Sequence, residues 1–344
     1  TWMSWCNCYI TKQKFYRNMS VLIYAEAQQG KVRKASIEAV SYGSKIAGAT
    51  GKAVHVVLMG HAATDEISRL AAFGGANIHH VASTGDVFDS GAAAHVMLKA
   101  AGDTQATVLV FTHDHSGRSV APMVAAKLNA ALVSGVTSLP EMNGNTWVVS
   151  KNVFSGKASV KYKLESAIKV LSLMPNALAP EAHAAAGNVV DYTSALAGYN
   201  SKIKGTRKAI EHKGGVPLTE ADLVVSAGRG MKGPENWHVI EELASSLGAA
   251  TACSRPVADI GWRPHHEHVG QTGIAIRPNL YIAVGISGAI QHLAGVNQSK
   301  VIVVINKDGD APFFKAADYG VIGDAMEVVP RLTEAIKKFK AQNH

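Results

Sequence analysis

The chain has 344 residues, 47% of them apolar and 17% charged, so it is long enough for about two globular domains with ample cores. Its net charge of +8 favours acidic partners, but the lysines and arginines are scattered apart from the tail Lys337-Lys338-Phe339-Lys340. No stripe of interleaved basic and aromatic residues is present, so nucleic acid is not expected as a partner. No apolar stretch reaches the roughly 18 residues of a transmembrane helix, so the protein is not expected to be membrane-embedded.

The first eighteen residues, TWMSWCNCYITKQKFYRN, are unusually rich in Trp, Cys and Tyr. They contain no apolar segment of a signal peptide and they precede a second start at Met19, so residues 1–18 are predicted to be a leader that is not native. Cys6 and Cys8 have no second Cys or His pair at metal-ligand spacing, so no zinc site is expected. Cys253 is the only other cysteine, which excludes a disulfide scaffold and suits a reducing compartment.

From Val21 onward, apolar strands alternate with helices. The predicted strands are Val21–Tyr24, Ala53–Met59, Ile78–Ala82 and Ala106–Phe111, and the predicted helices are Lys34–Ala47, Asp65–Phe73, Asp89–Ala101 and Val124–Leu128. Such alternation predicts a parallel sheet covered on both faces. After Leu139 the strands alternate polar and apolar residues. The segments Thr146–Phe154, Ala158–Leu164 and Ala167–Leu173 are therefore expected to form an antiparallel addition that closes a first domain of residues 19–200.

The sequence His113-Asp114-His115 suggests metal ligands at first sight. Adjacent residues in a loop diverge, and no third or fourth ligand is evident, so the segment is interpreted as a solvated loop near the domain interface and no metal is expected. Residues 175–217 are rich in Ala, Pro, Gly and Lys, which predicts a linker at Ser201–Pro217 and a second domain at 218–344.

The second domain opens with a strand, Leu223–Ser226, and the run Gly228-Arg-Gly-Met-Lys-Gly233 before a helix at Glu235–Leu247. This matches G-x-G-x-x-G in the context of a dinucleotide fold. The next strand, Ala249–Cys253, is expected to end on an acidic residue that binds the ribose, but Ser254-Arg255-Pro256 follows. An NAD site therefore lacks its ribose ligand. An NADP site stays open as an alternative, because an arginine accepts a 2′-phosphate.

Residues 280–306 form the most informative segment. A strand, Leu280–Val284, leads into Gly285-Ile-Ser-Gly288, then a short helix, and a second strand that ends on Asn306. Two glycines before a helix N-terminus make a phosphate cradle. Ser287 is expected to cap the helix or to donate to a phosphate oxygen, and Gln291, one turn later, to face the same ligand. The residues alone indicate a nucleotide-binding, redox-active protein.

Several segments of the second domain match one family in order and spacing, over about 100 residues. They are Gly228-Arg229-Gly230, Ser254-Arg255, Val269–Gly273, Ile286–His292, and Ala317–Gly320 with Asp324. This pattern resembles the electron transfer flavoprotein alpha subunit, and weaker similarity extends to the first domain. The resemblance implies an α/β fold of two domains. The N-terminal one is a parallel-sheet domain like those of adenine nucleotide hydrolases, with the subunit interface, and the C-terminal one is a Rossmann-like FAD-binding domain.

The resemblance also implies where FAD binds. Arg255 would lie against the flavin ring, where its cation favours the reduced, anionic form and raises the potential. Gln271 and Thr272 would contact the N5 and O4 edge, and His292 the O2 edge. The alternative for Arg255 is a surface salt bridge. Cys253, beside the flavin region, is interpreted as a small core residue rather than a redox thiol.

The remaining contacts involve the phosphates and the adenosine. Ser287, Gln291 and the Gly288 backbone would hold the pyrophosphate, Arg229 the phosphates or the flavin edge, and Asn306 and Asp324 the adenosine. The same motifs add Ser254, Gly273, Ala289 and Ala325, the last of which stands where the family often has leucine.

The resemblance implies an FAD-dependent one-electron carrier without its own substrate turnover, since no nucleophile or general-base motif accompanies the cofactor site. The family works as a heterodimer with a beta subunit, which commonly binds AMP. Electrons would come from acyl-CoA and related dehydrogenases and pass to a membrane ubiquinone oxidoreductase. A bacterial cytoplasm, or a mitochondrial matrix in a eukaryote, suits this role. The alternatives are an NADP-dependent flavin-type oxidoreductase and a non-redox nucleotide-binding protein.

Overall fold

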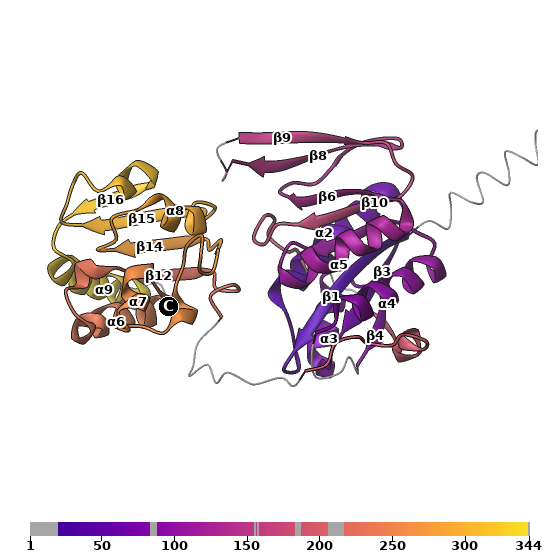
Figure 1. Ribbon diagram of the computed structural model, residues 1–344, viewed down its shortest axis with the longest axis horizontal. Helices are drawn as coiled ribbons and strands as arrows, with labels where there is room; N and C mark the ends of the chain where they lie inside the picture. The colour runs from indigo at the N-terminus through magenta and orange to yellow at the C-terminus, as the bar shows by residue number, and fades with distance from the viewer. Residues whose placement is uncertain are drawn as a thin grey trace, which may run out of the picture. The chain divides into compact units, whose positions relative to one another are not determined.

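The computed structural model describes residues 20–82, 88–154, 156, 158–182, 187–205 and 217–342 (Figure 1). The predicted leader, residues 1–18, lies outside these ranges, as does most of the predicted linker at 201–217. The chain divides into two compact units, Thr1–Ala209 and Ile210–His344. Each unit has its own sheet covered by helices, which confirms the predicted two-domain α/β fold.

The N-terminal unit is built on one large sheet that is mostly parallel. Its described strands are β1 (Ser20–Gln28), β2 (Lys31–Val32), β3 (Ala53–Met59), β4 (Asn77–Val81), β5 (Ala106–Thr112), β6 (Ala131–Val136), β7 (Glu141–Asn143), β8 (Thr146–Val153), β9 (Ala158–Leu164), β10 (Lys169–Leu173) and β11 (Asn188–Asp191). They run in the order β11-β4-β3-β1-β5-β10-β6-β8-β7, with β2 paired to β1 and β9 paired to β8.

The position of β10 corrects one prediction. Residues 167–173 were expected to belong to the antiparallel addition, but β10 runs parallel between β5 and β6. All five of its residues are buried, as expected for a central strand with both faces covered. The antiparallel addition consists of β7, β8 and β9 alone.

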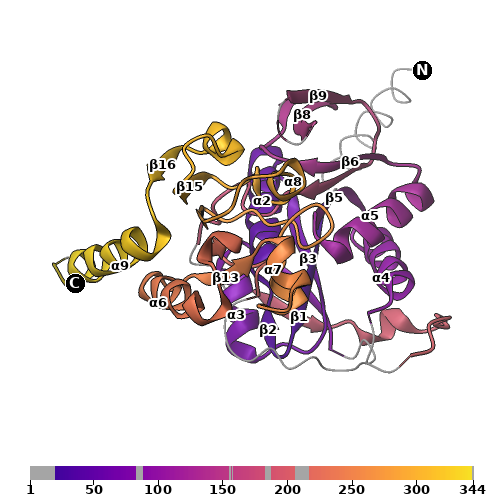
Figure 2. The same cartoon turned by 60° about the vertical axis from the view of Figure 1, so that its left-hand side comes forward.

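Side chains of β1 alternate between two hydrophobic cores on opposite faces of the sheet. Val21 and Ile23 pack in the core beneath α2 (Lys34–Thr50) and α3 (Thr64–Ala72). Leu22 and Tyr24 pack in the core beneath α4 (Ser90–Asp103) and α5 (His115–Leu128). Figure 2 shows α4 and α5 next to each other, and they are in contact along this second face.

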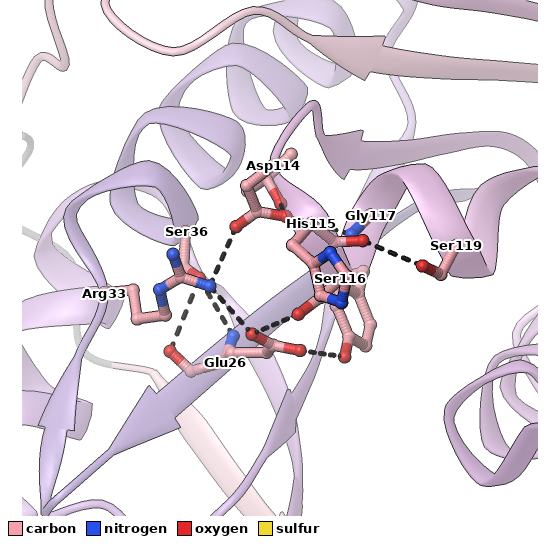
Figure 3. Close-up of polar contacts among 10 residues, drawn as sticks. Glu26, Arg33, Ser36, Asp114, His115, Ser116, Gly117 and Ser119 are labelled. Atoms are coloured by element: carbon pink, nitrogen blue, oxygen red, sulfur yellow. Dashed lines mark hydrogen bonds and ion pairs between the residues drawn. The ribbon is translucent and has the colours of Figure 1, made fainter. Parts of the chain in front are cut away.

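The strand order reverses between β1 and β5, and buried ion pairs fill the carboxyl ends of these two strands (Figure 3). Arg33 Nη1 lies 3.1 Å from Glu26 Oε2 and 3.0 Å from Asp114 Oδ2. The Tyr24 and Ser116 hydroxyls also donate to the Glu26 carboxylate, at 2.5 and 3.0 Å. One guanidinium therefore joins the buried carboxylate of Glu26 to the half-buried carboxylate of Asp114, from the two halves of the sheet.

Asp114 also corrects the interpretation of His113-Asp114-His115 as a solvated loop. Asp114 is the N-cap of α5, where its Oδ1 accepts from the Gly117 N–H at 2.9 Å. The half-buried His113 places Nδ1 2.9 Å from the Ser172 hydroxyl, and burial lowers its pKa to about 4. Among the described residues no group of three or more His, Cys, Asp or Glu is arranged to hold a metal ion.

Replacing Arg33 by methionine should strongly destabilise the protein. Two carboxylate side chains, 8% and 14% exposed, would lose their shared counterion, and removal of one partner from a buried ion pair costs about 3–5 kcal/mol. The matched control is Arg69→Met, because Arg69 pairs with Glu66 while 53% exposed and should contribute about 0.5 kcal/mol. Urea unfolding of the full chain measures both, and equal losses would contradict a structural role for Arg33.

The C-terminal unit contains a five-stranded sheet that is parallel throughout its described strands. These are β12 (Leu223–Ala227), β13 (Ala250–Cys253), β14 (Leu280–Val284), β15 (Val301–Asn306) and β16 (Tyr319–Ile322), in the order β13-β12-β14-β15-β16. The helices are α6 (Trp237–Leu247), α7 (Arg255–Asp259), α8 (Ile290–Val296) and α9 (Ala325–Gln342). The order reverses between β12 and β14, and ligands of such sheets bind at the carboxyl ends beside that point. In neither unit is a described helix long and apolar enough to cross a bilayer.

Candidate functional site

A cavity of about 510 Å³ opens at the carboxyl ends of β12, β13, β14 and β15, where the strand order reverses. Its volume lies in the usual range for cofactor and small-ligand sites. It is lined by Arg229, Gly230, Ser254, Arg255, Pro256, His268, Val269, Gly270, Gln271, Thr272, Gly285, Ile286, Ser287, Ala289, Gln291, His292, Asn306 and Asp308.

The cavity brings together ten of the fourteen residues predicted to bind a cofactor. They are Arg229, Ser254, Arg255, Gln271, Thr272, Ser287, Ala289, Gln291, His292 and Asn306. They come from segments up to 77 residues apart (229 to 306), which the parallel topology brings to one edge of the sheet. Their contact with a cofactor stays a prediction.

Two of the remaining four predicted residues are glycines that support the wall without lining it. A Cβ on Gly288, which has φ +83°, would lie 2.5 Å from Phe313 Cβ. A Cβ on Gly273 would meet the His268 carbonyl oxygen and lie 2.8 Å from its Nδ1. Both positions therefore require glycine for packing.

The other two predicted residues, Asp324 and Ala325, lie at the start of α9, outside the cavity lining. Asp324 accepts a hydrogen bond from the Met326 N–H at 2.9 Å and pairs with Lys232 at 3.0 Å. Ala325 is 6% exposed and belongs to the core beneath α6. Cys253 is fully buried, and burial raises the pKa of its thiol to about 12, so it stays protonated as a core residue.

Eight lining residues were absent from the predicted set. They are Gly230, Pro256, His268, Val269, Gly270, Gly285, Ile286 and Asp308. Most of them flank predicted residues within the same motifs. His268 and Asp308 carried a usable signal, since each polar side chain adjoins a segment already assigned to the site.

The loop between β14 and α8 differs in one detail from its prediction. Ala289, not Ser287, occupies the N-cap of α8, and no side chain caps the helix. The Ser287 carbonyl accepts from the Phe313 N–H at 3.1 Å, which ties the loop to the 3₁₀ turn at Pro312–Ala316. Its side chain is exposed at the cavity and free to meet a ligand.

Glycine pairs allow two backbone segments to approach closely beside the cavity. A Cβ on Gly230 would lie 2.6 Å from Gly285 Cα, and a Cβ on Gly295 would lie 2.5 Å from Gly270 Cα. The run Gly228–Gly233 differs from the dinucleotide fingerprint in its local structure. It does not open directly onto an α-helix, because two 3₁₀ turns, Arg229–Met231 and Pro234–Asn236, intervene before α6.

Two further contacts hold the cavity wall in place. The Gln271 N–H donates to the Gln291 carbonyl at 2.7 Å, which ties the turn at 268–274 to α8. The Asn306 side chain donates to the Ile286 carbonyl and accepts from the Asp308 N–H, both at 3.1 Å. Asn306 thus braces the loop after β14 as well as lining the cavity.

The cavity is positively charged. Arg229 and Arg255 are exposed at its wall, and Asp308 is the only carboxylate among its lining residues. Arg255 also pairs with Asp259 at 3.3 Å while 62% exposed, so the predicted salt bridge coexists with its position at the cavity. Burial lowers the pKa values of both His268 and His292, the latter to about 4, so the arginines carry the positive charge at neutral pH.

A parallel sheet with a glycine-framed, cationic cavity at its strand-order reversal defines an α/β protein that binds a nucleotide-type cofactor. Comparisons with known proteins agree. Residues 217–297 match the family described as the electron transfer flavoprotein FAD-binding domain, and residues 21–197 match the electron transfer flavoprotein domain.

Curated relatives extend this similarity over most of the chain. Electron transfer flavoprotein subunit alpha of Thermoanaerobacterium thermosaccharolyticum is 35% identical, over 93% of this chain and 98% of the relative. Electron transfer flavoprotein subunit alpha of Bacillus subtilis is 33% identical, over 92% of this chain and 97% of the relative. The mitochondrial electron transfer flavoprotein subunit alpha of Dictyostelium discoideum is 42% identical, over 65% of this chain and 64% of the relative. The chain belongs to the electron transfer flavoprotein alpha subunit family.

Replacing Gly285 by alanine should damage the cavity. Gly285 has φ +60°, and its Cβ would lie 2.8 Å from Gly230 Cα, so conformational strain and a backbone clash combine to about 3 kcal/mol. Gly248→Ala is the matched control, because Gly248 has φ +73° but open space around its Cβ, and should cost about 1 kcal/mol. Urea unfolding of the full chain compares the two. A loss no larger than that of the control would show that the close approach is unimportant.

Proposed function

We propose that this chain binds FAD in the cavity at the ends of β12–β15 and acts as an electron carrier rather than as an enzyme with its own substrate. The observation that carries the proposal is the cationic, glycine-framed cavity, which lies largely within the segment that matches the FAD-binding domain. Its volume of about 510 Å³ and its two arginines suit a ligand that contains a pyrophosphate.

The lining residues divide into two groups according to the chemistry that they offer. Ser287, Gln291 and Arg229 offer donors and positive charge to the pyrophosphate, and Asn306 offers an amide to the adenosine. Arg255, Gln271, Thr272 and His292 would surround the flavin. FAD supplies the redox chemistry when bound. The part of this chain is to hold it and to stabilise negative charge with the fixed cation of Arg255.

The partners follow from family membership as part of the proposal. The chain would pair with a beta subunit that binds AMP, accept electrons from acyl-CoA and related dehydrogenases, and deliver them to a membrane ubiquinone oxidoreductase. This work would take place in a bacterial cytoplasm or, in a eukaryote, in the mitochondrial matrix. Support comes from relatives in bacteria and a mitochondrial relative.

The full chain, expressed together with its beta subunit and purified, should be yellow and should show the absorption bands of a bound flavin. Protein that is colourless after supplementation with FAD would contradict the proposal. Binding of NADPH by this chain alone would favour the NADP-dependent reductase. Binding of an adenine nucleotide without any flavin would favour the non-redox alternative.

Replacing Arg255 by alanine should lower the flavin reduction potential, because a cation that favours the reduced, anionic form is lost. A decrease of about 60 mV is expected, equal to a tenfold change in a one-electron equilibrium. Arg255→Lys keeps the charge and should retain most of the wild-type potential. Dithionite titration against a reference dye measures all three proteins, and an unchanged potential in the alanine variant would remove Arg255 from this role.

A further inference from the structure

A buried tyrosine lies directly behind the histidine of the cavity. Tyr281 is on β14 and is fully buried, and its hydroxyl oxygen lies 2.8 Å from Nε2 of His292 on α8. The two ring centroids are 6.2 Å apart. His292 is itself 7% exposed and lines the cavity, so one hydrogen bond links the interior of the sheet to the cavity wall.

The protonation states and the second hydrogen bond of the ring together determine the direction of this hydrogen bond. Burial raises the pKa of Tyr281, so the phenol keeps its proton. Burial and the neighbouring His268 lower the pKa of His292 to about 4, so its ring is neutral at physiological pH. A neutral imidazole carries one ring proton, and a backbone hydrogen bond with Val269 raises the pKa of His292, as an acceptor of that proton does. With the ring proton on Nδ1 toward Val269, Nε2 is left as the acceptor of the Tyr281 hydroxyl.

The surrounding residues hold the His292 ring in this orientation. Phe313 is fully buried and contacts both rings, with its centroid 5.8 Å from that of His292 and 6.3 Å from that of Tyr281. Gly288, whose Cβ would collide with the Phe313 backbone and Cβ, allows Phe313 to approach the loop after β14. Nδ1 of His292 is buried, and the backbone of Val269 is a second hydrogen-bonding group beside the ring, so Tyr281 and Val269 together orient it.

We propose that Tyr281 is a positioning residue of the cofactor site: its hydroxyl donates to His292 Nε2 and holds the ring neutral, in one orientation and with its proton on Nδ1. A donor to the lone pair of a neutral imidazole stabilises the neutral form, so Tyr281 also keeps His292 from becoming a cation. The consequence for the cofactor rests on the proposed function, since a histidine that charged readily beside the flavin would make its potential depend on pH.

The test compares the full chain with Tyr281→Phe, both labelled with ¹⁵N-histidine, by NMR without any cofactor. His292→Gln identifies the signals of His292 among the 15 histidines of the chain. The wild type should show His292 with a protonated Nδ1 and an unprotonated Nε2 that accepts a hydrogen bond. In Tyr281→Phe the two tautomers should mix, and the pKa of His292 should rise by about one unit, a tenfold change in proton affinity.

Tyr319→Phe is the matched control, because Tyr319 is 67% exposed and the same hydroxyl is removed there. It should leave the His292 signals unchanged. A wild-type His292 with its proton on Nε2 would overturn the proposal even if Tyr281→Phe failed to fold. A folded Tyr281→Phe with the wild-type tautomer and pKa would also overturn it.

A second measurement separates this inference from the proposed function. In protein loaded with FAD, the flavin potential of Tyr281→Phe should rise on acidification more steeply than that of the wild type, as His292 gains a proton. Among the described residues, His268 and Tyr281 are the titratable groups that act on His292. Wild-type protein that binds no flavin would contradict the proposed function and leave the NMR result intact. Bound flavin with identical pH profiles would contradict the role of Tyr281 alone.

Discussion

The candidate site depends on the close approach of glycine backbones. The loops after β12 and β14 meet at Gly230 and Gly285, and the turn at 268–274 meets α8 at Gly270 and Gly295. A side chain at Gly230, Gly285 or Gly295 would separate the backbone segments that carry the polar residues of the cavity. Because a single Cβ would lie within 2.8 Å of the facing Cα atom in either pair, the fold has no small adjustment that could accommodate it. Arg229, Ser287 and Gln291 reach one cavity only because these glycines allow their loops to converge.

The two units differ in what occupies the carboxyl ends of their strands at the point where the strand order reverses. In each, the strand order of a parallel sheet reverses, which leaves a crevice between the loops at the carboxyl ends. In the N-terminal unit Glu26, Arg33 and Asp114 fill that position with a buried ion cluster, whereas in the C-terminal unit glycines leave a cavity. The cluster satisfies the polar groups that a ligand would otherwise meet. We therefore regard the N-terminal reversal point as a stabilising feature of the fold and the C-terminal one as the proposed binding site.

The predictions from sequence were most accurate where local pattern determines structure. The apolar runs 53–59 and 280–284 form strands with the predicted bounds, because their burial requires no information beyond the run itself. The error at β10 has a physical reason, since its place between β5 and β6 depends on partners 37 or more residues away. The N-cap at Ala289 and the bracing by Asn306 depend on exact loop geometry. His268 was missed although it adjoins the assigned turn Val269–Gly273, because a single histidine before a turn has no periodic pattern to mark it.

The charge of the cavity rests on arginine rather than on histidine, and this division has a physical reason. A guanidinium stays protonated throughout the physiological pH range, even where it is partly buried. His292 is covered by Phe313 and bonded to Tyr281, and its low pKa leaves it neutral. Under the proposed function, an anionic ligand would meet the positive charge of Arg229 and Arg255, together with the uncharged imidazole of His292. A carrier that must accept and release electrons at similar free energies under changing conditions benefits from this arrangement, because its potential then depends little on local proton exchange.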